Sequence, residues 1–574
     1  MRMHNSAIAG IFNDVADLLE IKGDNPFRIR AYRNAARTVY SLSQDISELI
    51  LQGEDLSKLP GIGKDLAYKI KEISTTGHLT ALDELQKELP PELIKLMKIA
   101  GLGGKRVSAI NKTLGVLTVS DLENAALNHK ICKLPGFGEK IEKGILEGIK
   151  KIHDESGRIL LYNAEEIVNR IFFHLKNCPF VNKMVVAGSF RRKKETVRDI
   201  DILITGEQPS VIFSQFLKFP EIQRIISHGD TRTTVVLHSG IQVDVRIVVE
   251  VSYGAALHYF TGSKAHNIGI RKRGVKLGLK INEYGIYRGS TRIGGENEEE
   301  VFKAVNLPFI EPELREDTGE IEAAYDNALP GLITQNQIRG DLHVHTIRTD
   351  GHATLEQMIE AARNRNYSYI AITEHSKKMS MTHGLTERDL AEQIETIHLL
   401  NENLHDFTVL SGIEVDILED GTLDLEDSIL ERLDLTVCSI HSKFNLSRNL
   451  QTERVLRAMD NPYFTIFGHP TGRILNKRPP IELDMERIFQ KAKKNRKILE
   501  VNSNPERMDL NDIYCKMAKE YGVKVVISTD AHSINDYNFM RFGVGQARRG
   551  WLGPDEVINT RDIKDLKTIL KMSR

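Results

Sequence analysis

Apolar residues recur at helical spacing at the start of the chain. The residues at intervals of three and four are Ile8, Ile11, Phe12, Val15, Leu18 and Leu19. This period predicts an amphipathic helix. A second helix is predicted from about Pro26, because proline fits the first helical turn. Its basic residues are Arg28, Arg30, Arg33 and Arg37. They indicate either a DNA-binding face or an ordinary solvated face.

Three glycine-containing turns are predicted in the rest of the first 150 residues. They lie at residues 59–64 (LPGIGK), 100–105 (AGLGGK) and 134–140 (LPGFGEK). Glycine permits φ > 0 at a turn, and the free amides of the following helix can hold a phosphate. The glycines are Gly61, Gly63, Gly101, Gly103, Gly136 and Gly138. The repetition favours helix-hairpin-helix contacts with the DNA backbone, and simple closure of helical hairpins is the alternative.

The middle of the chain has the period of strands. The apolar residues 184–187 predict a strand that ends at a Gly-Ser turn. Residues 188–204 (GSFRRKKETVRDIDILI) then predict a basic loop and a second strand, which opens with Asp199 and Asp201. Because strand side chains alternate between faces, these two aspartates point the same way, as a shared divalent cation requires. A further alternating stretch, QVDVRIV, contains Asp244 and could supply a third carboxylate.

Strands and helices alternate beyond an acidic boundary segment at about 312–337. The predicted elements are helices at 355–363 and 513–521 and strands at 369–373, 497–501 and 523–528. This alternation is typical of an α/β barrel-like fold, whose functional residues gather at the carboxyl ends of the strands.

Metal-ligand residue types occur at those strand ends. They are His343, His345, Asp350, His375, Glu414, His441, His469, Asp530 and His532. One histidine alone is more often a structural residue than a ligand, but this set predicts a metal site. Imidazole and carboxylate ligands without thiolate favour Mn²⁺, Zn²⁺ or Fe²⁺ over Mg²⁺ alone. Such a site suits the hydrolysis of a phosphoester.

Composition narrows the class of protein. A chain of 574 residues is too long for one domain. Charged residues make up 27% of it, but the net charge is only −1. Any affinity for DNA must therefore come from local basic faces. The cysteines, Cys132, Cys178, Cys438 and Cys515, have no paired spacing, which argues against disulfides and against a thiolate zinc site. With no apolar run of membrane-spanning length, we expect a soluble protein of the cytosol.

These motifs resemble those of two known families. Residues Gly188, Ser189, Arg192, Asp199, Asp201 and Asp244, followed by YFTGS at 259–263, resemble the palm and thumb of family X DNA polymerases such as DNA polymerase beta. The C-terminal ligand set resembles the polymerase and histidinol phosphatase (PHP) domain. Together the two resemblances span nearly the whole chain and suggest the bacterial two-module form of family X.

The resemblance implies a multidomain fold. It consists of α-helical helix-hairpin-helix N-terminal domains, an α+β nucleotidyltransferase palm and thumb, and a C-terminal distorted α/β (TIM-like) barrel. The implied domains are a helical DNA-binding domain at 1–85, a helix-hairpin-helix fingers-like domain at 86–150, a palm at 151–250, a thumb-like nucleotide-selection domain at 251–315, a linker at 316–337 and a PHP phosphoesterase domain at 338–574.

The resemblance also implies the roles of individual residues. In the palm, Asp199 and Asp201 would bridge two Mg²⁺ ions, and Asp244 would bind the primer-side ion. The implied nucleotide-binding residues are Arg158, Gly188, Ser189, Arg192, Arg246, Tyr259, Phe260, Gly262, Ser263, Asn267 and Arg271. In the PHP domain, the nine histidines and carboxylates named above would hold two to three Mn²⁺ or Zn²⁺ ions. Apart from the resemblance, the candidates for DNA contact in the C-terminal module are Arg473, Lys443 and the basic run at 491–497, although such a run is more often a solvated helix face.

The N-terminal domain has two implied roles toward a DNA gap. Arg28, Tyr32 and Lys64 are expected at the 5′-phosphate. Lys69 matches the lysine that polymerase beta uses as a Schiff-base nucleophile toward abasic sites. Here Asp65 replaces a helper lysine, and a carboxylate would raise the pKa of Lys69. A plain surface lysine is therefore the favoured interpretation.

The function implied is that of a bacterial repair polymerase. The first module would fill short gaps, and the second would act as a metal-dependent 3′-5′ exonuclease or abasic-site endonuclease. Gapped or primed DNA and deoxynucleoside triphosphates are the expected partners of a monomer without membrane contact. Two alternatives stay open: a polymerase fused to a small-molecule phosphatase of the histidinol-phosphate type, and a non-catalytic tether for DNA ends.

Overall fold

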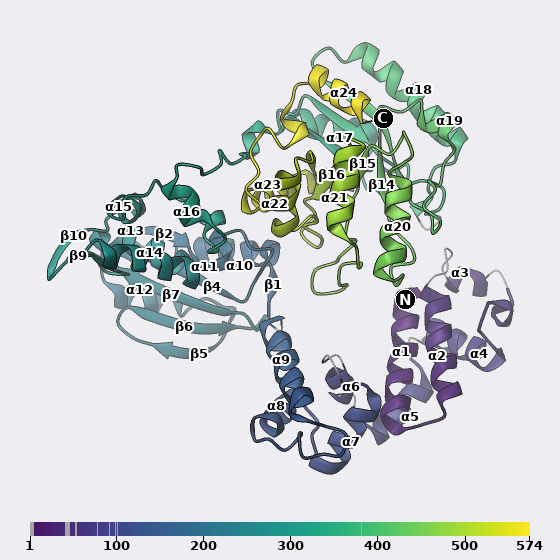
Figure 1. Ribbon diagram of the computed structural model, residues 1–574, viewed down its shortest axis with the longest axis horizontal. Helices are drawn as coiled ribbons and strands as arrows, with labels where there is room; N and C mark the ends of the chain where they lie inside the picture. Colours follow the sequence, from purple (N-terminus) through teal and green to yellow (C-terminus); the bar gives the residue numbers. More distant parts are fainter. Residues whose placement is uncertain are drawn as a thin grey trace. The chain divides into compact units, whose positions relative to one another are not determined.

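The computed structural model separates into two compact units, Met1–Ser156 and Gly157–Arg574, and each is considered by itself (Figure 1). It describes residues 5–40, 46–51, 54–76, 78–90, 92–97, 99, 102–155, 157–379 and 382–573. Within these ranges, none of the helices has both the length and the apolar character needed to span a bilayer.

The first unit is helical. Its helices are α1 (Asn5–Lys22), α2 (Pro26–Tyr40), α3 (Ile46–Leu51), η1 (Leu56–Lys58), α4 (Lys64–Thr76), α5 (Thr80–Glu88), α6 (Glu92–Met97), α7 (Gly104–Leu114), α8 (Val119–Leu127) and α9 (Glu139–Glu155). The apolar faces of α1, α2, α4 and α5 form one buried cluster, and those of α6 to α9 form a second. The predicted glycine turns directly precede α4, α7 and α9, whose first residues are Lys64, Gly104 and Glu139.

The second unit begins with a mixed five-stranded sheet. The sheet domain, as this part is called below, contains β1 (Ile159–Leu160), α10 (Leu161–Leu175), β2 (Val181–Val186), α11 (Gly188–Arg191), β3 (Thr196–Val197), β4 (Asp199–Gly206), α12 (Pro209–Phe216), β5 (Ile222–His228), β6 (Arg232–Leu237), β7 (Gln242–Val248) and η2 (Glu250–Ser252). Among the described residues, the short strands β1 and β3 pair only with each other. The sheet order is β2-β4-β7-β6-β5, and β4 and β7 are its parallel pair. The predicted strands with Asp199, Asp201 and Asp244 are therefore direct neighbours.

A smaller α+β segment follows the sheet. It contains α13 (Tyr253–Thr261), α14 (Lys264–Lys276), β8 (Lys280–Asn282), β9 (Gly285–Arg288), β10 (Thr291–Gly294), α15 (Glu298–Ala304), η3 (Pro312–Leu314), α16 (Glu320–Tyr325) and η4 (Gln335–Gln337). At the start of α15, the buried Glu298 accepts hydrogen bonds from Arg191 at 2.8 Å and from Arg315 at 2.5 Å. Glu298 thus links this segment to the helical turn that precedes β3.

Glu298→Gln is expected to destabilise this contact. Burial alone would raise the pKa of Glu298, but the two arginines outweigh it and lower the pKa to about 2. A carboxylate with a depressed folded-state pKa stabilises above its ordinary pKa of 4.5 and loses that effect as pH falls toward 2. We expect a loss of about 3 kcal/mol in the free energy of unfolding at neutral pH, since the buried Arg315 and the partly buried Arg191 both lose their anionic partner.

Denaturant unfolding followed by the fluorescence of Trp551 tests this prediction. Trp551 is the only tryptophan and packs against the apolar cluster of this segment. The difference between Glu298→Gln and the unmodified chain should shrink as pH falls from about 4.5 toward 2. Glu299→Gln, at the exposed neighbouring position, serves as the control. Equal stability of Glu298→Gln and the unmodified chain at neutral pH would contradict the prediction.

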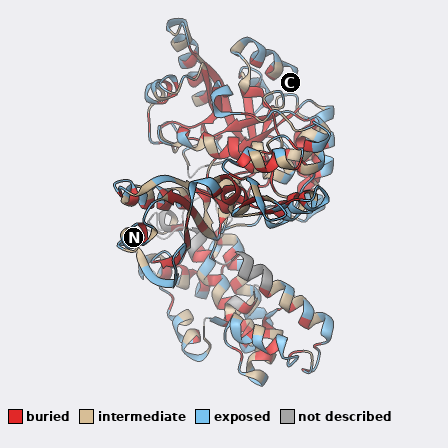
Figure 2. Ribbon diagram, turned by 90° about the vertical axis from the view of Figure 1, so that its left-hand side faces the viewer, coloured by how far each residue is buried: buried red, intermediate tan, exposed pale blue. Residues whose placement is uncertain are grey.

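The rest of the chain forms a seven-stranded parallel barrel. Its strands are β11 (Gly340–Val344), β12 (Tyr369–Ile372), β13 (Thr408–Asp416), β14 (Leu435–Ser439), β15 (Ile466–Phe467), β16 (Ile498–Asn502) and β17 (Val525–Ser528). They follow one another in chain order around the sheet, and a bridge between Val344 and Ala531 nearly closes it. Figure 2 shows the strands buried and the outer helix faces exposed.

Helices surround these strands. They are α17 (Leu355–Arg363), α18 (Glu387–Asn403), α19 (Asp427–Leu430), α20 (Arg448–Ala458), α21 (Met485–Lys494), α22 (Asp512–Tyr521), η6 (Asp536–Phe539), α23 (Met540–Arg549), η7 (Ile558–Thr560) and α24 (Ile563–Met572). Nearly every residue of these strands is buried, polar residues included, because each strand is covered on both faces.

The barrel packs directly on the five-stranded sheet domain. Met508 and Phe542 of the barrel belong to the buried apolar cluster of that domain. Arg473 makes two hydrogen bonds to Glu195, at 3.2 and 2.6 Å, and is only 8% exposed. The prediction that Arg473 contacts DNA is therefore corrected: its guanidinium is used inside the protein, to hold the barrel on the sheet domain.

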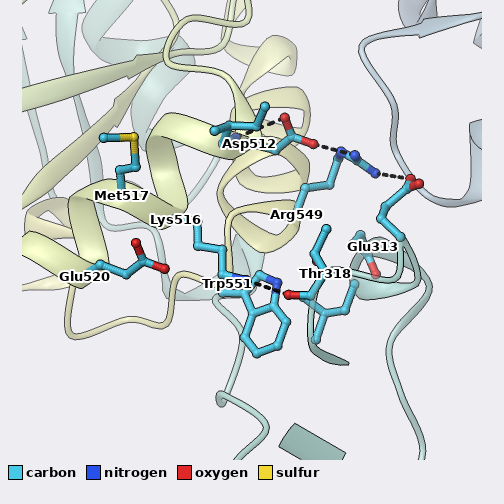
Figure 3. A pocket seen from close by; sticks show the side chains of 11 residues that line it. Glu313, Thr318, Asp512, Lys516, Met517, Glu520, Arg549 and Trp551 are labelled. Carbon is cyan, nitrogen blue, oxygen red and sulfur yellow. Dashed lines mark hydrogen bonds and ion pairs between the residues drawn. The ribbon is translucent and has the colours of Figure 1, made fainter. Parts of the chain in front are cut away.

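A second contact lies where the segment after η3 meets α22 and α23. A cavity of about 300 Å³ opens there, lined by residues that include Thr318, Lys516 and Trp551 (Figure 3). Lys516 Nζ donates to the carbonyl oxygen of Thr318 at 2.8 Å and lies 4.3 Å from the centre of the Trp551 ring. Arg549 pairs with both Asp512 and Glu316. The sheet domain, its α+β extension and the barrel thus form one continuous body.

Candidate active sites

Three aspartates meet on the parallel strand pair β4 and β7. Asp201 is the direct register partner of Asp244, and Asp199 precedes it on the same face of β4. Gly188 faces them with a left-handed φ of 60°, and a Cβ at that position would lie 2.4 Å from the Oδ2 atom of Asp201. Only glycine therefore fits the turn, which leads into Ser189 at the start of α11.

The electrostatics of this trio favour a bound cation. Burial and the neighbouring charges of Asp199 and Asp244 raise the pKa of Asp201 to about 7. The charges of these neighbouring carboxylates oppose ionisation of Asp201 unless a cation balances them. The three side chains therefore fit the oxygen ligand set that Mg²⁺ prefers.

Residues of the neighbouring strand β6 orient Asp244. Arg232 donates to Asp244 Oδ1 from Nε at 2.8 Å and from Nη2 at 2.6 Å, and the Thr234 hydroxyl donates at 2.6 Å. The Gln242 amide donates to Oδ2 at 2.8 Å. Burial would raise the pKa of Asp244, but these hydrogen bonds lower it, so the carboxylate stays ionised. Sequence reasoning missed Arg232 and Thr234, although their alternation on β6 places both on one face.

Two arginines expected to bind the triphosphate already have protein partners. Arg192 donates to Glu316 at 2.9 Å and to the carbonyl oxygen of Thr261 at 2.5 Å. Arg158 donates to the hydroxyl and the carbonyl oxygen of Thr196 at 2.8 and 2.6 Å. The predicted residues Gly262 and Ser263 separate α13 from α14 beside Arg192. A triphosphate bound here would compete with Glu316 for Arg192.

The aromatic and polar residues of α13 and α14 form a connected group. The rings of Tyr259 and Phe260 lie edge to face at 5.1 Å, and Arg246 of β7 lies 4.3 Å from the Phe260 ring centre. The side-chain amide of Asn267 donates to the backbone carbonyl oxygen of Tyr259 at 2.7 Å. The backbone carbonyl oxygen of Asn267 accepts from Arg271 Nε at 3.3 Å. Among the described residues the Asn267 Oδ1 atom has no hydrogen-bond partner, although it is buried.

The nine predicted ligands of the barrel gather at the carboxyl ends of its strands. Their donor atoms form three groups, within each of which they lie no more than 4.8 Å apart: His345, Asp350, His375 and His532; His343, His345 and Asp530; and His375, Glu414 and His441. His469 Nε2 lies 2.9 Å from Glu414. Glu414 is central, because the nitrogens of His375, His441, His343 and His345 lie 2.9, 3.2, 3.4 and 3.6 Å from its oxygens.

Buried nitrogens in this cluster fit bound metal ions. Within the part of the chain that the structure describes, His343 Nε2, both ring nitrogens of His345 and the Nδ1 atom of His469 are buried without a hydrogen-bond partner. Burial and the neighbouring His532 and His375 lower the pKa of His345 to about 3, which leaves a neutral imidazole, the form that binds a metal. Burial alone would raise the pKa of Glu414, but the surrounding histidines hold that pKa well below its usual range.

Further carboxylates orient these ligands. Glu500 accepts from His343 Nδ1 at 2.7 Å and from the His469 amide at 2.6 Å. This hydrogen bond leaves His343 Nε2 to face Glu414. Glu374 accepts hydrogen bonds from the hydroxyls of Thr346 and Thr349, on the loop between His345 and Asp350. Glu500 was missed from sequence, although an acidic residue in the middle of the short strand ILEVN was a visible signal.

The glycine turns of the first unit adopt the geometry that phosphate contacts require. Gly61 and Gly136 have φ values of 75° and 80°. Gly63 and Gly138 have open space where a side chain would begin, and Gly103 caps α7. Gly101 lies outside the described residues. The free amides of α4, α7 and α9 are therefore available to an anion, as predicted contacts with a DNA backbone require.

One expected 5′-phosphate residue does not match the structure. Tyr32 is only 2% exposed and packs edge to face against Phe12 at 5.5 Å, because it lies on the apolar side of α2. Arg28 and Lys64 are exposed, and Arg28 pairs with Asp24 at 3.1 Å. Of the three residues, these two remain placed to reach a phosphate.

Comparisons with known proteins agree with this arrangement. Family models match residues 3–79 (helix-hairpin-helix domain), 93–151 (SAM-like helix-hairpin-helix tandem), 256–316 (DNA polymerase beta thumb) and 341–504 (PHP domain). An aspartate trio beside a polymerase thumb, joined to a histidine-lined barrel, defines a DNA polymerase with a PHP module.

The chain belongs to the family X DNA polymerases that carry a PHP domain. It is 38% identical to the DNA polymerase/3′-5′ exonuclease PolX of Bacillus subtilis over 576 residues, which cover 99% of this chain and 100% of that protein. Probable phosphatases of Thermoanaerobacter sp. and Clostridium novyi are 30% and 26% identical and match 40% of this chain. The predicted resemblance and fold class are confirmed.

Proposed function

We propose that this protein is a DNA-directed DNA polymerase that fills short gaps during DNA repair and trims 3′ ends with its barrel. The observation that carries the proposal is the presence of two separate centres in one continuous body. One has three aspartates on adjacent strands, and the other has six histidines and three carboxylates at strand ends. The relative over the full chain is a polymerase and a 3′-5′ exonuclease.

In the sheet domain, Asp199, Asp201 and Asp244 are the proposed catalytic residues. Two Mg²⁺ ions held by them would supply activation of the primer 3′-hydroxyl and neutralise charge on the triphosphate. Arg232 and Thr234 keep Asp244 ionised and fixed in direction. The side-chain amide of Asn267 is a donor of the kind that suits the acceptors on the minor-groove edge of the new base pair, and it would leave the Tyr259 carbonyl oxygen to reach them.

In the barrel, the nine ligands would hold two or three ions, with Mn²⁺ or Zn²⁺ favoured by the imidazoles. Such ions supply Lewis-acid activation for phosphoester hydrolysis. Glu414 lies between His375 and His469 and positions both rings. DNA contacts from the helix-hairpin-helix turns would favour a nucleic-acid substrate over a small phosphate ester.

An activity panel tests the proposal on the full chain. The substrates are gapped, nicked and abasic duplexes with either Mg²⁺ or Mn²⁺. We expect gap filling with deoxynucleoside triphosphates and 3′-end shortening without them. The partial match to probable phosphatases motivates one addition, histidinol phosphate as a competitor. Inhibition of 3′-end shortening by this compound would favour the phosphatase alternative, and absence of any nucleotide incorporation would refute the polymerase.

Weak lyase activity is a further prediction. Lys69 Nζ lies 2.6 Å from Asp65. Burial would lower the pKa of Lys69, but Asp65 and the Tyr32 hydroxyl raise it, so the amine stays protonated and is a poor nucleophile. Asp65→Ala should increase borohydride trapping on abasic DNA by up to about tenfold, since one pKa unit changes the free-amine fraction tenfold.

The controls for this prediction are on the same helix. Adding Lys69→Ala to the Asp65→Ala variant should remove the gain, and Lys71→Ala should leave it intact. Equal trapping by the unmodified chain and Asp65→Ala would contradict the proposed role of Asp65.

A further inference from the structure

A third cluster of metal-binding side chains lies in the first unit, outside both active sites. It consists of His129, Cys132 and Glu142, whose donor atoms lie within 4.8 Å of one another. His129 follows α8 with a left-handed φ of 51°, Cys132 lies in the next turn, and Glu142 lies in the first turn of α9. Of the groups of this kind among the described residues, it is the one that contains a cysteine.

Hydrogen bonds hold the three residues together. Glu142 is 3% exposed, and its Oε1 atom lies 2.8 Å from His129 Nδ1. Its Oε2 atom accepts from the backbone N–H of Cys132 at 2.9 Å. The Cys132 thiol donates to the carbonyl oxygen of His129 at 3.4 Å. The buried carboxylate is thus fixed in direction before any ion binds.

The spacing of these residues is that of a compact metal site. Two ligands separated by two residues in a turn, followed by a ligand in the first turn of a helix, resemble the arrangement of many zinc sites. Tetrahedral bonds to sulfur and nitrogen place ligand atoms about 3.5 Å apart, so small side-chain rotations suffice here. The scattered cysteines argued against a thiolate site, but a histidine and a glutamate supply the missing ligands.

We propose that His129, Cys132 and Glu142 bind one Zn²⁺ ion, with a fourth position open to water. Thiolate, imidazole and carboxylate together suit a borderline-soft ion and disfavour Mg²⁺. As the metal–sulfur bond forms, the S–H bond breaks and its proton passes to solvent. The bound ion would fix the turn directly before residues 134–138, which include the Gly136 turn.

Cobalt absorption on the full chain tests this site directly. Chelator-treated protein is titrated with Co²⁺, and a thiolate-to-metal charge-transfer band is recorded in the near ultraviolet. The nine ligands of the barrel contain no sulfur, and Cys178, Cys438 and Cys515 are buried. The band therefore reports on Cys132. Because the barrel ligands also take up Co²⁺, we expect the band to level off only after several equivalents, at the intensity of one thiolate ligand per chain, and to disappear when Zn²⁺ is added.

Variants make the result decisive. Cys132→Ala should remove the band, and Cys178→Ala should keep it. His129→Ala should weaken Co²⁺ binding at least tenfold, and because the His129 side chain is 76% exposed this substitution leaves the core intact. Absence of a band in the unmodified chain, or an unchanged band in Cys132→Ala, would overturn the proposal.

Discussion

Glu414→Gln is expected to reduce 3′-end shortening by about 10³-fold, the scale on which an enzyme loses rate with one central electrostatic group. The Glu414 carboxylate faces five imidazoles, those of His343, His345, His375, His441 and His469. The amide keeps the shape of the side chain but removes its charge and places a donor among ring nitrogens. Metal ions would then lose their shared anionic ligand.

Two measurements separate this effect from misfolding. The metal content of purified Glu414→Gln should fall, whereas its gap filling should remain, because the aspartate trio lies on a different sheet. Glu419→Gln, at an exposed position shortly after the same strand, is the matched control and should keep both activities. Exonuclease activity of Glu414→Gln within a few-fold of the unmodified chain would show that the barrel site was wrongly assigned.

Sequence periodicity predicted the features that depend on one strand or one turn. Asp199 and Asp201 share a face because strand side chains alternate, and this held without knowledge of the partner strand. Most of the barrel ligands were visible because they lie late in a strand or shortly after one, and carboxyl strand ends meet at one edge of a barrel. The helix starts at Lys64 and Glu139 followed from their glycine turns.

Features that depend on contacts between distant segments were not predictable. Arg232 reaches Asp244 only because β6 pairs with β7 in a particular register. From sequence alone, Arg473 was a candidate for DNA contact. It is buried against Glu195 only because the barrel packs on the sheet domain. Tyr32 lies in a basic helix, but the packing of α1 decides which side of that helix is covered. Periodicity identifies a face and does not identify what covers it.

Asp201→Asn is expected to reduce gap filling by about 10²- to 10³-fold or more, because it removes a ligand that both ions would share. The same substitution should stabilise the fold when a chelator is present. The pKa of Asp201 is raised to about 7 by burial, Asp199 and Asp244, so the folded protein gains stability from a proton that is lost as pH rises. A neutral asparagine avoids that loss.

Opposite changes in activity and stability therefore identify a catalytic role for Asp201, since a merely structural residue would lose both together. Primer extension on gapped DNA measures the first change, and the melting temperature at pH 8 with chelator measures the second. Asp230→Asn, in the exposed turn before β6, should change neither. Near-normal primer extension by Asp201→Asn would refute the aspartate trio as the polymerase centre, whereas intact 3′-end shortening by this variant would show that the two centres work independently.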